Sequence, residues 1–376
     1  MKLKIKREVL LENLNKVSKA LSTKNLIPTL SGIKFELTKK GLTLTASNND
    51  ITIQKFIPIK DKNINVDKEG KIVIQGKEIL DIVRIIPDEE INIEVIDELK
   101  VLIYTDDERI KYDLNVININ EYPKIELEKS DNSVEIEKEE FLNLIKETAF
   151  ATSVDESRPV LTGINLKING DILECNATDS YRLATKTIKL KKAVEESHNI
   201  IIPSKNIVEF SRIVDNSDSI ISFHIFSNKV LFEDEDLLFQ SRLINGNYPN
   251  TSKLIPEDSI LKITADLYTL KSVIEQASIL TSDKEKNVVS LSTSDNTLTV
   301  KSVSNEKGKA ETKMEVKKNN KEDITIAFSA KYMTDALNAL KTDEVELSFV
   351  GEVKPITIKN TEDDGLTQLV VPIRTY

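Results

Sequence analysis

The feature that most constrains the fold is a pattern of helices and strands that recurs three times along the chain. Amphipathic helical spacing, with apolar residues at i, i+3, i+4 and i+7, is predicted over residues 7–21, 138–153 and 266–281. Each helix precedes two alternating segments joined by turn residues, which predict a β-hairpin. The hairpins begin 131 and then 125 residues apart, at Gly32, Gly163 and Val288.

A second helix is predicted in each copy, between two strand-like runs, over residues 76–86, 204–214 and 329–340. A period near 130 residues is too long for a small-repeat solenoid. The 376 residues therefore predict one domain copied three times, with boundaries at 1–125, 126–250 and 251–376. Two helices and many short strands in each copy predict an α+β fold, with the helices on one face of antiparallel sheets.

Copied domains tend to be arranged symmetrically, and closing them into a ring removes exposed sheet edges, which are aggregation hazards. If the sheets join edge to edge, all the helices fall on one wall. The charge on the helices then decides what that wall can meet.

The second helices carry a recurring basic pair. Lys77 and Arg84 are seven residues apart, as are Lys205 and Arg212, so the two members of each pair share a helix face. The third copy has Lys331 and Asn338 at these positions, and the first helices add Lys6, Arg7, Lys16, Lys19, Lys146 and Lys271. Ordinary solvated helix faces are the alternative interpretation, since lysine is common on any surface.

The net charge of −10, from 52 basic and 62 acidic residues, taken alone argues against a nucleic-acid-binding protein, since such proteins are normally basic. It does not exclude positive charge gathered on one surface. Acidic runs lie in the strands and turns, at residues 88–90, 106–108, 233–236 and 362–364. A basic helical wall would meet phosphates without reading bases, which suits a protein that slides on DNA.

Three strings then resemble a known family. Residues 176–184 read Asn-Ala-Thr-Asp-Ser-Tyr-Arg-Leu-Ala, residues 335–341 read Asp-Ala-Leu-Asn-Ala-Leu-Lys, and residues 368–376 read Gln-Leu-Val-Val-Pro-Ile-Arg-Thr-Tyr. With the triple repeat, they resemble the bacterial DNA polymerase III beta subunit, the β sliding clamp family, over essentially the whole chain. The resemblance implies a non-catalytic, head-to-tail homodimer: a ring of six similar domains around a hole lined by twelve helices.

The resemblance also implies a pocket between the second and third domains that accepts a short apolar peptide motif. Carried over by position, it would use Leu161, Thr178, Ser180, Tyr181, Arg182, Leu183, Pro249, Lys253, Leu254, Tyr332, Val370, Val371, Pro372, Ile373 and Arg374. The chain departs from the family in two places. Ser180-Tyr181 stands where Gly-His is frequent, and Lys253 stands where Arg is frequent, which leaves the preferred motif open.

Partners and contacts follow from the same resemblance. They are double-stranded DNA bound without sequence preference, the replicative polymerase alpha subunit, an ATP-dependent clamp loader, and other motif-bearing proteins such as repair polymerases, mismatch-repair proteins and ligase. The resemblance points to Lys24, Arg158 and Lys205 as DNA contacts, and the recurring basic pairs add Lys77, Arg84 and Arg212. The expected subunit interface sets Tyr112 and Leu114 against Ile279 and Leu280, closing the ring at two equivalent contacts.

The sequence contains no recognisable catalytic motif. His198 and His224 lack metal-ligand spacing, and no nucleotide-binding or nucleophile-elbow motif occurs. Asp179 is expected to hold a turn, and Cys175, the single cysteine, to be a small strand residue. We expect no metal, no cofactor, no membrane segment and a cytoplasmic location. The alternative function is a peptide-binding scaffold of three repeated domains that does not bind DNA; a hydrolase with an acid pair is remote.

Overall fold

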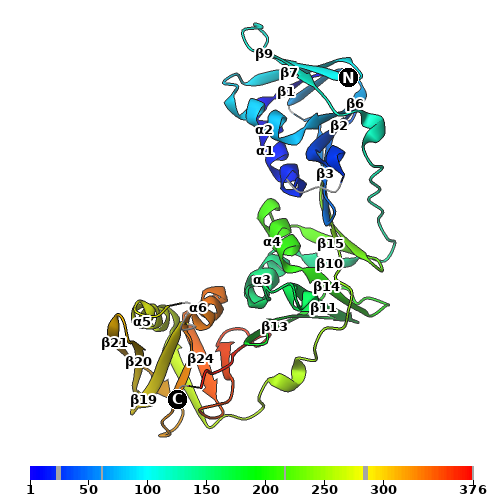
Figure 1. Cartoon of the computed structure of the whole chain (residues 1–376). Helices are drawn as coiled ribbons and strands as arrows, with labels where there is room; N and C mark the ends of the chain where they lie inside the picture. The colour runs from blue at the N-terminus through cyan, green and yellow to red at the C-terminus, as the bar shows by residue number, and fades with distance from the viewer. Residues whose placement is uncertain (23–26, 61, 216, 283–286, 375–376) are drawn as a thin grey trace. The chain divides into compact units, whose positions relative to one another are not determined.

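The computed structural model describes residues 1–22, 27–60, 62–215, 217–282 and 287–374. The chain divides into two compact units. Figure 1 traces the whole chain, coloured by residue number. Unit 1 comprises Met1–Lys138 and Glu209–Leu243, and unit 2 comprises Glu139–Val208 and Ile244–Tyr376. No helix in the described ranges is both long and apolar enough to cross a lipid bilayer.

Unit 1 contains two antiparallel sheets. The five-stranded sheet has the order β5-β1-β7-β8-β9, and the eight-stranded sheet has the order β10-β15-β16-β17-β4-β3-β2-β6. The strands of the first are β5 (Ile64–Lys68), β1 (Lys2–Lys6), β7 (Glu90–Asp97), β8 (Lys100–Tyr104) and β9 (Lys111–Asn115). The strands of the second are β10 (Val134–Glu137), β15 (Ile220–Ile225), β16 (Lys229–Asp234), β17 (Leu237–Arg242), β4 (Ile51–Pro58), β3 (Gly41–Ser47), β2 (Gly32–Thr38) and β6 (Gly70–Gln75).

The eight-stranded sheet joins the first predicted copy to the second. Strand β17 pairs antiparallel with β4, with Leu237 opposite Lys55 and Ser241 opposite Ile51. The hydrogen-bonded sheet therefore continues from one copy into the next without an exposed edge.

Helices α1 (Arg7–Val17) and α2 (Gly76–Ile85) pack against each other in unit 1, and α1 also lies on β3 and β4. The close packing explains a glycine at the start of α2. A Cβ built on Gly76 would lie 2.2 Å from the Cδ1 atom of Leu21. The absence of a side chain at this position lets the start of α2 pack closely against its neighbours.

Unit 2 also contains two antiparallel sheets. Its nine-stranded sheet has the order β14-β11-β12-β13-β26-β25-β24-β18-β22, and its four-stranded sheet has the order β21-β20-β19-β23. The first comprises β14 (His198–Pro203), β11 (Gly163–Asn169), β12 (Ile172–Thr178), β13 (Arg182–Lys189), β26 (Leu366–Val370), β25 (Ile356–Asn360), β24 (Glu344–Phe349), β18 (Leu261–Asp266) and β22 (Lys317–Lys318). The second comprises β21 (Gly308–Glu315), β20 (Thr297–Ser304), β19 (Val288–Ser294) and β23 (Thr325–Ser329).

The nine-stranded sheet joins the second copy to the third by the pairing of β13 with β26, where Arg182 is opposite Val370. Beside this pairing, the Lys186 ammonium group forms ion pairs with Glu147, at 3.0 Å, and with Asp363. Burial lowers the pKa of Lys186, but the two carboxylates outweigh it and the pKa is raised. The ammonium group therefore stays charged and ties the two copies together.

Helices α5 (Leu267–Ser278) and α6 (Ala330–Ala339) pack against each other over the core of the third copy. The boundary between the units passes through α3 (Lys138–Thr148) and α4 (Ser204–Ile213). The predicted helices exist, but each is shorter than expected. Helices α1 and α3 end earlier than predicted because 3₁₀ segments follow them, Ser18–Ala20 after α1 and Ala149–Ala151 after α3.

The prediction was wrong about Lys6, which is the last residue of β1 rather than part of a helix. It also missed the strand before the first helix of each copy, namely β1, β10 and β18. The strand that directly follows each hairpin was missed too, namely β4, β13 and β21. Cys175 is a buried strand residue, as predicted, and burial raises the pKa of its thiol to about 12.

Unit 1 holds a buried cation, Lys138, whose side chain is 1% exposed. Its ammonium group lies 2.8 Å from Asp215 and 2.7 Å from Asp234, and it donates to the Ser217 hydroxyl group. The bond from Lys138 holds the pKa of Asp215 well below its ordinary value. This cluster fixes the start of α3 to the sheet.

Replacing Lys138 with Met should lower the free energy of unfolding of the full chain by about 3 kcal/mol, because Asp234 stays buried without its cation. Urea denaturation at pH 7 measures this. Lys129→Met, which removes an exposed ion pair with Glu233, should cost less than about 1 kcal/mol. Similar losses for the two variants would contradict a special role for the buried cluster.

The wild type and Lys138→Met can also be compared as a function of pH. The folded-state pKa of Asp215 is depressed, so its contribution is present above its unfolded pKa, about 3.9, and is lost as pH falls through the folded value. The stability difference between the wild type and Lys138→Met should therefore narrow below about pH 4. A constant difference down to pH 2 would contradict this.

Candidate functional site

The turn between β12 and β13 is built by one carboxylate. The Oδ1 atom of Asp179 accepts hydrogen bonds from the backbone N–H groups of Tyr181, at 2.9 Å, and Arg182, at 3.0 Å. Its Oδ2 atom accepts from the Arg182 Nε, also at 3.0 Å. Asp179 thus has the structural role that the sequence predicted.

Arg182 links this turn to α6. Its guanidinium group donates to the Asp335 carboxylate at 2.6 Å and lies 4.6 Å from the ring centre of Tyr332. It also lies 5.5 Å from the ring centre of Phe150. A cation held between two rings and two carboxylates is fixed in position, so the side chain can orient its neighbours.

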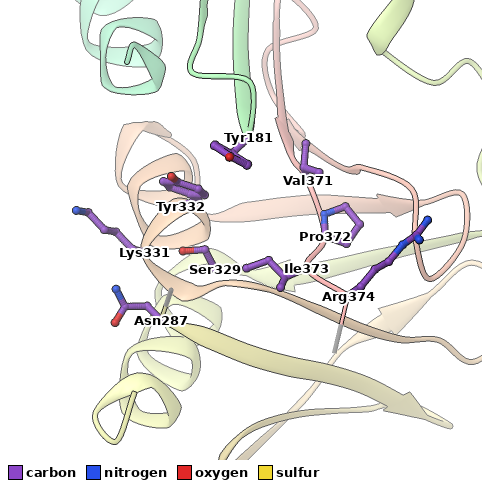
Figure 2. Close-up of a pocket in the computed structure, with 9 residues that line it drawn as sticks. All are labelled: Tyr181, Asn287, Ser329, Lys331, Tyr332, Val371, Pro372, Ile373 and Arg374. Atoms are coloured by element: carbon purple, nitrogen blue, oxygen red, sulfur yellow. The ribbon is translucent and has the colours of Figure 1, made fainter. Parts of the chain in front are cut away.

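A cavity of about 530 Å³ opens beside this turn in unit 2 (Figure 2). We call it the C-terminal cleft. The rings of Tyr181 and Tyr332 stack with centres 6.3 Å apart. The remaining lining residues are Asn287, Ser329, Lys331, Val371, Pro372, Ile373 and Arg374.

The chain end runs along the cleft as extended backbone. The Val371 N–H donates to the Tyr181 carbonyl oxygen at 2.9 Å, and the Ile373 N–H donates to the Ala327 carbonyl oxygen at 2.7 Å. These bonds continue the sheet pairing beyond β26. Apolar side chains of this segment and the two tyrosine rings then form one wall, with the charged ends of Lys331 and Arg374 at the rim.

Six of the fifteen pocket residues expected from the sequence line the C-terminal cleft: Tyr181, Tyr332, Val371, Pro372, Ile373 and Arg374. Leu161, Thr178, Leu183 and Val370 are buried, and Arg182 is nearly so. Ser180, Pro249, Lys253 and Leu254 are exposed. The backbone N–H of Thr178 donates to the hydroxyl oxygen of Tyr248, the residue before Pro249, at 3.0 Å.

The sequence missed three lining residues: Asn287, Ser329 and Lys331. Ser329 and Lys331 flank the first residue of α6, and Asn287 lies just before the hairpin that begins at Val288. Only the position of Lys331 carried a signal, because it belongs to the recurring basic pair of the second helices.

The expected DNA contacts lie on exposed helix faces or loops. Lys77 and Arg84 lie opposite the buried face of α2, and Arg84 is bonded to Asp81 at 3.1 Å. Arg212 is similarly 3.4 Å from Glu209, while Lys205 and Arg158 are exposed. The basic pairs therefore share their faces with carboxylates. Lys24 lies outside the described residues.

Two of the expected interface residues lie in a sheet-edge strand, and the other two lie just after a helix. Tyr112 and Leu114 alternate with exposed residues in β9, which is the last strand of its sheet. Ile279, just after α5, is 72% exposed, and Leu280 follows it.

No group of His, Cys, Asp or Glu side chains within the described ranges could hold a metal ion. What the geometry offers is a rigid, partly apolar cleft for an extended ligand, on repeated domains whose sheets join edge to edge. Repeated α+β domains whose sheets join edge to edge define the clamp fold.

Comparison with known proteins gives the family. Models of the DNA polymerase III beta subunit match residues 1–126 with the N-terminal domain, 135–250 with the central domain and 252–374 with the C-terminal domain. The beta sliding clamps of Bacillus subtilis strain 168 and Staphylococcus aureus strain Mu50 are 36% and 35% identical, each with 100% of both chains covered. The crystal structure of the B. subtilis DNA polymerase sliding clamp matches with a TM-score of 0.95, over 100% of both chains.

The chain belongs to the DNA polymerase III beta subunit family, the beta sliding clamps. These are non-catalytic processivity factors of a DNA polymerase, with a three-domain clamp fold and, typically, a ring-shaped dimer.

The structure also explains one departure from the family pattern. Ser180 has a φ of 78°, in the left-handed region that favours glycine. Its hydroxyl group lies 3.1 Å from Arg158 Nη1, which donates to it. Serine here therefore keeps a polar contact at a conformational cost of about 1 kcal/mol.

Ser180→Gly should be more stable than Ser180→Ala by about 1 kcal/mol, because both lose the hydroxyl contact but only glycine relieves the backbone. Thermal and urea unfolding of the two variants measure the difference. An alanine variant as stable as the glycine variant would contradict the conformational argument.

Proposed function

We propose that two copies of this chain close into a ring around duplex DNA and hold a polymerase there through the C-terminal cleft. The observation that carries the proposal is the cleft itself, with Tyr181, Tyr332 and the 371–374 segment on one wall, in a chain of the sliding clamp family. A static ring that also offers a peptide cleft can keep an enzyme on its template without any chemistry of its own.

The cleft suits a short extended peptide with apolar side chains. Val371, Pro372 and Ile373 offer apolar surface, while Lys331 and Arg374 can donate to peptide carbonyl groups at the rim. Leu161, Leu183 and Val370 are buried, so we assign them to packing near the cleft and not to contact with the peptide. We assign exposed Pro249, Lys253 and Leu254 to the entry side of the same site.

The partners of the cleft are the polymerase alpha subunit, the clamp loader and other proteins that carry the motif, including repair polymerases, mismatch-repair proteins and ligase. Sharing one cleft would make these partners compete. The chain has no nucleotide-binding motif, so the ATP for opening the ring would be used by the separate loader.

The exposed cations of the helices are assigned to the DNA side. Lys77, Arg84, Lys205 and Arg212 lie on helix faces, with Arg158 in a loop and Lys24 at a position implied by sequence alone. Because Asp81 and Glu209 hold two of these arginines, phosphate contacts would be weak and exchangeable. Weak contacts that read no base let a ring slide.

Closure into a ring has support in the sheet topology. The sheets at the two internal junctions have eight and nine strands, whereas β9 ends a sheet of five and β21 ends a sheet of four. Joining these two edges between chains would produce a third sheet of the same size. A head-to-tail contact of this kind closes with two copies.

We place the domain boundaries at 1–125, 126–250 and 251–376, and the protein in the cytoplasm, where its DNA lies. A scaffold that binds peptides but not DNA is the competing function, and it would need neither ring closure nor cations on the helices.

Reversing Lys77, Arg84, Lys205 and Arg212 to Glu should shorten retention on nicked circular DNA by at least about tenfold, because favourable phosphate contacts become repulsive. Retention is measured by gel filtration after loading with the cognate loader and ATP. The matched control reverses four exposed lysines on strands and turns: Lys39, Lys40, Lys100 and Lys189.

Linearising the DNA should release the wild type and the control alike. Binding of the polymerase alpha subunit should stay unchanged in all three proteins. Equal retention of the helix variant and the control would contradict a basic inner wall, and no retention of any protein on circles would favour the scaffold.

Replacing Tyr332 with Ala should weaken binding of the alpha subunit by roughly 30-fold, because an aromatic anchor of the cleft is lost. Ile373→Ala should weaken it less. Isothermal titration with the whole alpha subunit measures both. Val353→Ala, at an exposed valine outside the cleft, is the control and should leave affinity unchanged. Unchanged affinity in Tyr332→Ala would place the partner elsewhere.

A further inference from the structure

The internal repeat predicts more than the existence of a subunit contact. We propose that β9 of one chain pairs antiparallel with β21 of a second copy in a single register, set by Lys111 opposite Glu311 and Asp113 opposite Lys309. This inference rests on the ring proposed above and assigns its register and the side chains that select it.

The first step identifies the equivalents of β21. Strands β4, β13 and β21 each follow a hairpin, and the hairpin closes at the pairs Thr38–Gly41, Asn169–Ile172 and Ser294–Thr297. Six residues further on, the hairpin strand pairs with its third strand at Ser47–Thr52, Thr178–Leu183 and Val303–Lys309. Lys309 therefore holds the place of Thr52 and Leu183.

The second step identifies the equivalents of β9. The register is followed from the residue before each first helix, through three successive pairings, to the last strand of the same copy. In the first copy, Lys6 pairs with Glu90. Two residues further along the same strand, Asn92 pairs with Tyr104, and Tyr104 in turn pairs with Lys111. The same path ends at Leu238 in the second copy and at Thr367 in the third. Two residues later stand Asp113, Gln240 and Leu369.

At both internal junctions, the equivalent positions of the two strands lie directly opposite each other. Gln240 is opposite Thr52 at the first junction, and Leu369 is opposite Leu183 at the second. The equivalent pair between chains is Asp113 and Lys309. Counting two residues back on one strand and two forward on the other gives Lys111 and Glu311.

The faces of the strands agree with this register. Tyr112 and Leu114 are opposite buried Ile103 and Val101, so they belong to the core face of their sheet. On β21, Ala310 lies on the core face with Thr312, whose hydroxyl group donates to the Val273 carbonyl oxygen in α5 at 2.9 Å. The register sets Tyr112 opposite Ala310.

The charges on the outer face separate this register from its neighbours. A shift by one residue would turn Tyr112 and Leu114 away from the core face. A shift by two residues in one direction sets Lys111 opposite Lys313 and Asp113 opposite Glu311. The opposite shift sets Lys111 opposite Lys309. Both place like charges across the strands, which is destabilising.

These charges are also available for a partner chain. In the part of the chain that the structure describes, Lys111, Asp113 and Lys309 form no ion pair or side-chain hydrogen bond. Glu311 accepts from Lys301 at 2.9 Å and from Lys313 at 3.0 Å and would add Lys111 to this group. Three unpaired charges on two sheet edges thus find complements in one register.

Disulfide trapping tests the register in the full chain. Directly opposite residues in antiparallel strands have Cα atoms about 4.5–5.5 Å apart, within the range for a disulfide bond, whereas residues displaced by two are too distant. Asp113→Cys with Lys309→Cys should yield a covalent dimer under mild oxidation. The matched control, Asp113→Cys with Glu311→Cys, should not. The native Cys175 is buried.

Sedimentation of the wild type separates the two levels of the proposal. A monomer at micromolar concentration would overturn the ring and the register together. A dimer that cross-links through the control pair, or through neither pair, would overturn the register alone.

Charge exchange tests the selecting side chains. Asp113→Lys should raise the dimer Kd about tenfold, and adding Lys309→Asp should bring it back to within about threefold of the wild type. Asp364→Lys makes the same charge change on an exposed loop and should leave the Kd unchanged. A double variant no tighter than Asp113→Lys alone would overturn the pairing.

Discussion

The structure depends on one interaction, the pairing of a strand at the end of one copy with a strand at the edge of the next. Each copy on its own would leave two rows of unpaired backbone groups, which would bind water or other chains. The pairing of β17 with β4 and of β13 with β26 turns these liabilities into continuous sheets. These two strand pairings, which we call the seams, hold the three copies together.

The C-terminal cleft is a consequence of the second seam. The bond from Val371 to the Tyr181 carbonyl group extends the β13–β26 pairing past the end of the strand, so the last residues follow a fixed path. Arg182, at the start of β13, then connects this path to Tyr332 and Asp335 of α6. A partner that enters the cleft meets a wall already in place and loses little free energy to ordering it.

Much of this fold could be predicted, because period and spacing are local properties. The helices and hairpins appeared in the sequence since their apolar residues recur within a few positions. Strands β1, β10 and β18 were missed because each runs directly into the following helix, with no turn residue between them to mark the end of the strand. The lengths of α1 and α3 were overestimated because the apolar spacing continues through the 3₁₀ turns that end them.

The site was less accessible to prediction. Asp179 could be assigned to its turn since its partners are two and three residues away. The ion pairs of Lys186 could not, because Glu147 comes from helix α3 and Asp363 from the loop between β25 and β26, both far from Lys186 in the sequence. Likewise, Ser329 and Asn287 reach the cleft only through the fold of the third copy, and no motif marks them.

The same seam has different consequences within a chain and between chains. Within the chain, the paired strands are tethered, so a broken seam meets its partner again at a high effective concentration. The β9–β21 contact that we propose has no tether, and its closure depends on protein concentration and on the match of a few charges. A ring of six domains would therefore open at the two contacts between chains and not at the four within them. Weak selection by exposed charges at those two contacts fits a ring that must close in one register and still be opened.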